Sequence, residues 1–280
     1  MASVKESRGT FLKDVLVIDV EGSTPTPTGS ELVNVAVQKS MDSGFPVIEM
    51  SAEEGLVTLV LPVFRSNRIV SLAAFVAWAS EEAIGVFEIW QPIGEYDELN
   101  LTGGYFGSLE RFQNVSSFVR FEKGSGLPGQ VWRNLSHVVH DNLPRHTGFL
   151  RAAGASAKSL QVAVGMPVLS DQFMATALLI SSDLAPISRA FEVWRYADDS
   201  FLLETKAYQN LPTTLRLEEG ASVATTGSLP GLALETGVVR VTDAPKVLGN
   251  GRGNESFTGK GIAVPFFEGE RLTNVLTLVL

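Results

Sequence analysis

The longest apolar stretch of the chain, residues 56–78, is interrupted at its middle by a polar group that contains Arg65, Asn67 and Arg68. Its length would suit a membrane span, but these arginines would lie at the centre of the bilayer, where a charge is most costly. The pattern instead predicts two buried strands joined by a polar turn.

The same pattern occurs twice more along the chain. Pro167 and Pro265 take the place of Pro62 near the end of an apolar strand, and in each case a polar turn and a second apolar strand follow. Nearly continuous apolar strands are typical of the centre of a sheet that is covered on at least one face by helices. The chain therefore contains three copies of one apolar hairpin.

Other landmarks recur about 100 residues apart and in the same order. Phe87-Glu88-Ile89-Trp90 returns as Phe191-Glu192-Val193-Trp194, and Gly126-Leu127-Pro128-Gly129 returns as Ser228-Leu229-Pro230-Gly231. Such a period indicates repeated structural units. We expect two complete units, residues 81–184 and 185–280. Residues 1–80 form a partial unit that keeps the hairpin and lacks the Phe-Glu-x-Trp opening.

Within the middle unit the pattern alternates strands with short helices. Residues 86–91 and 99–106 are rich in aromatic and β-branched residues and predict a strand pair. Pro128 marks the start of a short helix, and the Ala-rich residues 149–159 favour another. Each unit is therefore expected to be α+β, an antiparallel sheet with helices packed on it.

Composition and charge narrow the classes of function. The 280 residues are 45% hydrophobic and include no cysteine, which excludes thiol nucleophiles, thiolate-bound metals and thioether-linked chromophores. The net charge of −9 opposes binding to nucleic acid or an anionic membrane. The polar residues 1–10 do not resemble a secretory signal. We expect a cytoplasmic protein.

The middle unit contains the motif Gly124-Ser-Gly126-Leu-Pro-Gly129-Gln-Val-Trp132, the segment Phe149-Leu-Arg151-Ala-Ala153, and an apolar strand that ends at Pro167. In these features it resembles a GAF domain. The resemblance covers about 100 residues and is weaker over residues 185–280. It implies tandem sensory or regulatory units, each a six-stranded antiparallel sheet with helices on one side and a pocket between the sheet and the overlying loops.

Members of this family bind cyclic nucleotides, tetrapyrroles, haem, amino acids or 2-oxo acids, or bind nothing and serve as dimerisation modules. The lack of cysteine argues against covalent tetrapyrrole attachment and against methionine sulfoxide reduction. By the family pattern Trp132, Phe149 and Arg151 are ligand-binding candidates around the pocket, since an arginine beside aromatic walls can hold a carboxylate or phosphate. In the alternative reading the two aromatic residues are core and Arg151 lies on the surface.

Three histidines and two repeated glutamates are further candidates for a functional site. On a strand, His137 and His140 would point to opposite faces, and the repeat aligns them with Val238 and Val241. We therefore expect that these two histidines and His146 do not form a metal site. Glu88 and Glu192 alternate with apolar residues, which places them on the solvent side of a strand. No nucleophile motif or paired carboxylate points to an enzyme.

We therefore expect a non-enzymatic regulatory protein that binds a small molecule or a protein partner, with the ligand or cofactor unknown. The alternative is a purely structural dimerisation module with filled pockets. Self-association is expected because a partial unit must complete its sheet against something. A different α+β module with a chance GAF-like motif would instead carry helices on both faces of its sheet.

Overall fold

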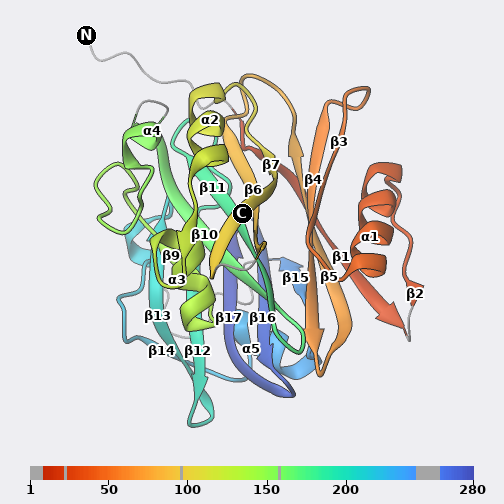
Figure 1. Ribbon diagram of the computed structural model, residues 1–280. Coiled ribbons are helices and arrows are strands. Elements are labelled where there is room, and N and C mark those ends of the chain that lie inside the picture. The colour runs from red at the N-terminus through yellow and green to blue at the C-terminus, as the bar shows by residue number, and fades with distance from the viewer. Residues whose placement is uncertain (1–8, 22–23, 95–96, 157–158, 244–258) are drawn as a thin grey trace.

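Each of the three apolar hairpins forms the centre of an antiparallel sheet, and each sheet is built from one continuous stretch of the chain (Figure 1). The computed structural model describes residues 9–21, 24–94, 97–156, 159–243 and 259–280. The molecule has a mostly-sheet α+β fold with repeated units. Within the described residues, no helix combines the length and apolar composition needed to cross a membrane.

The first sheet has the strand order β2-β1-β5-β4-β3, and one helix, α1, packs on it. Its elements are β1 (Leu12–Glu21), β2 (Thr24–Pro25), α1 (Glu31–Ser43), β3 (Val47–Ser51), β4 (Leu56–Arg65) and β5 (Arg68–Trp78). The interrupted apolar stretch therefore forms two strands and a turn, as the sequence predicts.

The second sheet has the order β8-β7-β6-β11-β10-β9 and carries three helices. Its elements are β6 (Gly85–Pro92), β7 (Glu98–Tyr105), α2 (Glu110–Phe118), β8 (Phe121–Glu122), α3 (Gly126–Asn134), β9 (Val138–His140), α4 (Ala152–Ser156), β10 (Leu160–Leu169) and β11 (Phe173–Ser182). The third sheet repeats this order as β14-β13-β12-β17-β16-β15. Its elements are β12 (Ala190–Ala197), β13 (Ser200–Tyr208), the 3-10 helix η1 (Thr213–Leu215), β14 (Ser222–Ala224), α5 (Leu229–Thr236), β15 (Arg240–Asp243), β16 (Lys260–Glu268) and β17 (Arg271–Val279).

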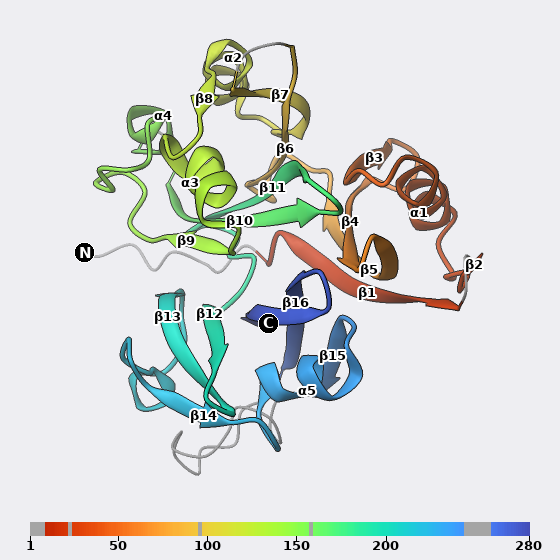
Figure 2. The same cartoon turned by 60° about the horizontal axis from the view of Figure 1, so that its bottom comes forward.

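The sheets pack against one another through their inner faces. One continuous cluster of buried residues joins Phe75 of the first sheet, Phe87 and Val164 of the second, and Phe191 of the third. In Figure 2 the helices α1, α3 and α5 lie outside their sheets, around this shared centre. The helices of the first two sheets are held by separate outer clusters. The central strands are therefore covered on both faces.

The repeat extends to the first unit, contrary to part of the sequence prediction. β1 pairs with β5 as β6 pairs with β11 and β12 with β17, so β1 holds the place of the Phe-Glu-x-Trp strand. Its residue Leu16 lies opposite Ala74 where Glu88 lies opposite Leu178. The first unit therefore has its opening strand. What it shortens is the neighbouring strand, because β2 has only two residues.

Strands β4, β10 and β16 meet at the centre of Figure 2. The three repeated prolines, Pro62, Pro167 and Pro265, line one small apolar space there. The turns of the three hairpins meet above it: Arg65 Nε lies 2.7 Å from Glu270 Oε2, and Asn67 donates to Asp171. The units are thus arranged with approximate threefold symmetry.

Two repeated glycines explain why the Gly-Leu-Pro-Gly landmark recurs. A β-carbon on Gly129 would lie 2.1 Å from the carbonyl oxygen of Glu122, and one on Gly231 would lie 2.0 Å from that of Thr225. Neither backbone leaves room for a side chain. In both units the helix therefore packs directly on the segment that precedes it.

Candidate functional site

Arg151 lies inside the middle unit and is 3% exposed. It precedes α4, and its guanidinium faces Glu88 on β6: Arg151 Nη2 donates to Glu88 Oε2 at 2.9 Å, and Nη1 donates to Glu88 Oε1 and to the Ser116 hydroxyl. The surface reading of Arg151 is therefore wrong. The two side chains form a buried ion pair with two parallel hydrogen bonds, an arrangement that suits a planar guanidinium facing a planar carboxylate.

Aromatic rings surround this ion pair. The Arg151 guanidinium carbon lies 4.7 Å from the ring centre of Phe112, 5.2 Å from that of Phe149, 5.4 Å from that of Trp90 and 5.8 Å from that of Phe121. A cation within about 6 Å of such rings is attracted by their faces. Trp90 also donates from Nε1 to Glu88 Oε2 at 2.9 Å. The cluster is satisfied from within the chain.

The expectation that Glu88 faces solvent is wrong, because its side chain is 0% exposed. On β6 the residues Val86 and Trp90 share its face and belong to the cluster under the helices, whereas Phe87 and Ile89 face the shared centre. Alternation along this strand therefore separates two buried faces and not core from solvent.

The candidate residues do not all meet at one place. Phe149 and Arg151 belong to the cluster described above, but the Trp132 ring stacks on Phe173 of β11 with ring centres 5.4 Å apart, under Lys123. The Arg151 charge is neutralised by Glu88, so the interior of this unit resembles a ligand site that the chain's own carboxylate fills. The sequence does contain a signal that Glu88 is unusual, because both complete units place a glutamate between large apolar residues at this position.

The third unit repeats the buried carboxylate with different partners. Glu192 is buried, and its carboxylate accepts from the Tyr208 hydroxyl at 2.9 Å. The first unit has Leu16 at the equivalent position. A buried carboxylate at this position is therefore a feature of the two complete units.

Two of the three histidines, His137 and His140, are buried. His137 is buried, and its Nδ1 lies 2.5 Å from Asn274 Oδ1; burial lowers the pKa of His137 to about 4, and this hydrogen bond opposes part of the shift. His140 stacks on His146 with ring centres 3.8 Å apart. Burial, and then repulsion from His146, lowers the pKa of His140 to about 3. The described residues contain no group of three side chains suited to a metal ion.

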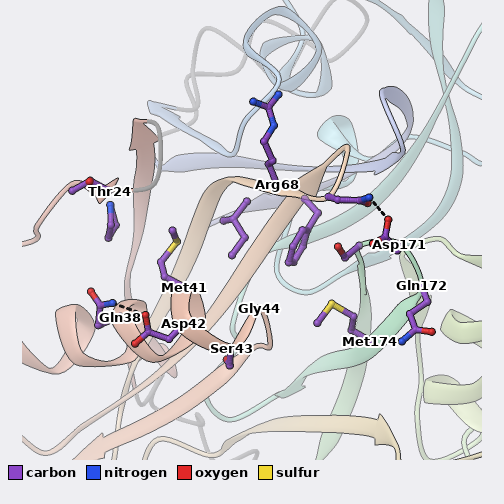
Figure 3. Close-up of a pocket in the computed structure, with 15 residues that line it drawn as sticks. Thr24, Gln38, Met41, Asp42, Ser43, Gly44, Arg68, Asp171, Gln172 and Met174 are labelled. Carbon is purple, nitrogen blue, oxygen red and sulfur yellow. Dashed lines mark hydrogen bonds between the residues drawn. The ribbon is translucent and has the colours of Figure 1, made fainter.

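A cavity of about 840 Å³ lies where the first sheet meets the second (Figure 3). We call it the junction cleft. The half-buried side chains of Met41, Phe64 and Met174 form its apolar part, and Asp42 and Asp171 lie on either side. Gln38 donates to Asp42 at 2.8 Å, and Asn67 donates to Asp171. Its volume is within the usual range for small-molecule sites.

The junction cleft has no signal in the sequence. Its residues come from β2, from the end of α1, and from the β4–β5 and β10–β11 hairpins, which are brought together only by the packing of two sheets. No motif marks such a site, because its residues are divided between two units.

No family model matches the chain. No curated protein matches it either. Among solved structures, similar ones include GAF domains. The A. aeolicus Nlh2 GAF domain in an inactive state is 17% identical with a TM-score of 0.29, over 35% of this chain and 57% of that one. The GAF domain of a two-component sensor histidine kinase from Bacillus halodurans is 12% identical with a TM-score of 0.26, over 33% and 63%.

The Staphylococcus aureus NreA protein, mutated in its nitrate binding site, is 18% identical with a TM-score of 0.31, over 38% of this chain and 81% of that one. The present chain spans little more than half the length of the A. aeolicus structure.

Proposed function

We propose that this chain is a non-enzymatic regulatory protein of three GAF-like units that binds a small molecule in the junction cleft. The observation that carries the proposal is the cavity of about 840 Å³ lined by both the first and the second sheet. A molecule bound there contacts two units at once, so its binding free energy would stabilise one arrangement of the two over others. That is what a regulatory protein requires.

The interior of the middle unit supports this choice of site. The Glu88 carboxylate already pairs with the Arg151 guanidinium, and four aromatic rings enclose both groups. A carboxylate or phosphate ligand would have to displace a bidentate internal partner. In this proposal Trp132, Phe149 and Arg151 therefore contribute to packing and not to ligand binding. The ligand binds in the junction cleft.

A second candidate function is the structural module with filled pockets. It is favoured by the closed ion pair and by Phe118, which ends α2 and is 85% exposed. An exposed aromatic residue on a helix suits contact with another protein.

Native mass spectrometry of the purified protein, followed by the same measurement under denaturing conditions, tests the proposal. We expect a bound species that is lost on unfolding. Ser43 lies in the last turn of α1 at the junction cleft, and Ser117 lies in the last turn of α2 outside it; both are exposed. Ser43→Trp should abolish retention, whereas the matched variant Ser117→Trp should not. An empty protein whose dimer is lost with Phe118→Ser would favour the structural module.

A further inference from the structure

The three sheets form a closed ring of junctions. In the strand order of each sheet the last strand is β3, β9 or β15, and this last strand contacts the next unit. β3 faces β7, β9 faces β12 and β13, and β15 faces β1. Before each of these last strands a helix ends at a residue in the left-handed conformation, namely Gly44, Leu135 and Gly237. The three junctions can therefore be compared position by position.

Two junctions are joined by the same hydrogen bond. The His137 backbone N–H donates to Asn274 Oδ1 at 3.3 Å, and the Val239 backbone N–H donates to Ser71 Oγ at 3.0 Å. Both donors stand immediately before the last strand of their unit. Both acceptors pair with the residue that follows the repeated proline in the next unit. The bond thus belongs to the repeat.

At the third junction neither half of this bond can exist. The position before β3 is Pro46, which has no backbone N–H, and the position equivalent to Ser71 and Asn274 is Ala175, which pairs with Val168 and has no side-chain acceptor. The junction cleft lies at this junction. Its position therefore coincides with a break in the threefold pattern.

We propose that the junction cleft binds an organic ammonium ion with an apolar body; this inference rests on the proposed function. The two methionines and Phe64 offer polarizable and aromatic surface that suits an apolar body and its cationic end. Asp42 and Asp171 each accept one amide hydrogen bond, and an ionised carboxylate has capacity for more.

The charges around the junction cleft select the sign of the ligand. In Figure 3 the Arg68 side chain points away from both Asp42 and Asp171. Among the described residues that line the junction cleft, the two carboxylates outnumber one cation, Arg68, within a chain of net charge −9. A ligand of the same shape with a carboxylate in place of the ammonium would meet two like charges. Preference for the cationic over the anionic ligand of the same shape would distinguish this site from an apolar groove that binds both equally.

Isothermal titration calorimetry with 2-phenylethylammonium and with phenylacetate tests the selection. We expect the ammonium ion to bind and phenylacetate to bind at least tenfold more weakly. Asp171→Asn should weaken ammonium binding about tenfold, as expected for loss of one charge-assisted contact. Glu270 is the matched control, because it accepts hydrogen bonds from the first hairpin as Asp171 does but lies outside the lining. Glu270→Gln should leave binding unchanged. Equal binding of both probes, or no binding of the ammonium ion, would overturn the proposal.

A second experiment tests the break in the pattern. Pro46→Val with Ala175→Ser installs the residue pair of the Val239 and Ser71 junction. We expect the double variant to fold and to bind 2-phenylethylammonium at least tenfold more weakly, because the restored bond fixes a different spacing between the two units that line the junction cleft. Unchanged affinity would refute the link between the break and the site. If native mass spectrometry finds a retained neutral or anionic species that Ser43→Trp releases, the ammonium assignment fails while the proposed function stands.

Discussion

Replacement of Arg151 by methionine tests whether the ion pair inside the middle unit is closed to water. Glu88 is 0% exposed and Arg151 is 3% exposed. Arg151→Met keeps an apolar side chain of similar length but leaves the Glu88 carboxylate with only Ser116 and Trp90 as described donors. Removal of one partner of a buried pair costs about 3–5 kcal/mol. That is a large share of the roughly 5–15 kcal/mol that stabilises a folded protein.

Equilibrium unfolding in guanidinium chloride, followed by tryptophan fluorescence, measures this loss. The matched control is Arg195→Met, because Arg195 pairs with Glu204 at 2.7 Å but both side chains are more than a third exposed. An exposed pair contributes about 0–1 kcal/mol. The double variant Glu88→Leu with Arg151→Met should recover much of the loss, since the first unit already has Leu16 at the Glu88 position. Equal losses for Arg151→Met and Arg195→Met would refute the reasoning.

Three further predictions follow from the fold. Gly129→Ala and Gly231→Ala should each cost about 2 kcal/mol or more through overlap with a backbone carbonyl, whereas Gly103→Ala, which meets its nearest atom at 3.5 Å, should cost less than about 1 kcal/mol; chemical denaturation compares them. Burial holds the pKa values of His137 and His140 at about 4 and about 3, below 6.5, so the unfolded state takes up protons first. Stability should be full above pH 6.5 and fall towards pH 5 by up to about 1.4 kcal/mol per pH unit for each histidine, and the fall should be smaller in His137→Gln. Ala175→Ser alone should destabilise the protein by about 1 kcal/mol or more because it buries an unpaired hydroxyl, and Pro46→Val should reverse that loss; additive effects in the double-mutant cycle would contradict it.

The apolar hairpins and the repeated units could be predicted from sequence because each depends on local pattern. Residues 56–78 form two strands, and strands 86–91 and 99–106 agree closely with β6 and β7. Of the Ala-rich residues 149–159, Ala152–Ser156 form the helix α4, and residues 157–158 lie outside the described residues. The opening strand of the first unit was missed because β1 has Leu16 and Ile18 where the other units have glutamate and tryptophan.

Errors about the site arose from packing that no single repeat reveals. Alternation along β6 predicts that Glu88 faces solvent if only one face of the strand is covered, yet helices and a neighbouring sheet cover both faces of β6. The repeat alignment placed His137 with Val238, but the strand registers place it with Val239. That shift of one residue hides the shared hydrogen bond and the break at Pro46. The junction cleft needed the arrangement of two units, which pattern within one unit cannot supply.

The ring of junctions also limits how this protein can aggregate. Each junction joins two different surfaces, a head and a tail, and such heterologous contacts form filaments unless the rotation between neighbours closes. Here the contacts close after three units within a single polypeptide, so each of these surfaces is already covered by the neighbouring unit of the same chain. Removal of residues 9–78 would leave β9 and β12 joined but would free the faces of β7 and β15 that β3 and β1 cover. The shortened chain would then present a matched head and tail on one molecule and is expected to polymerise.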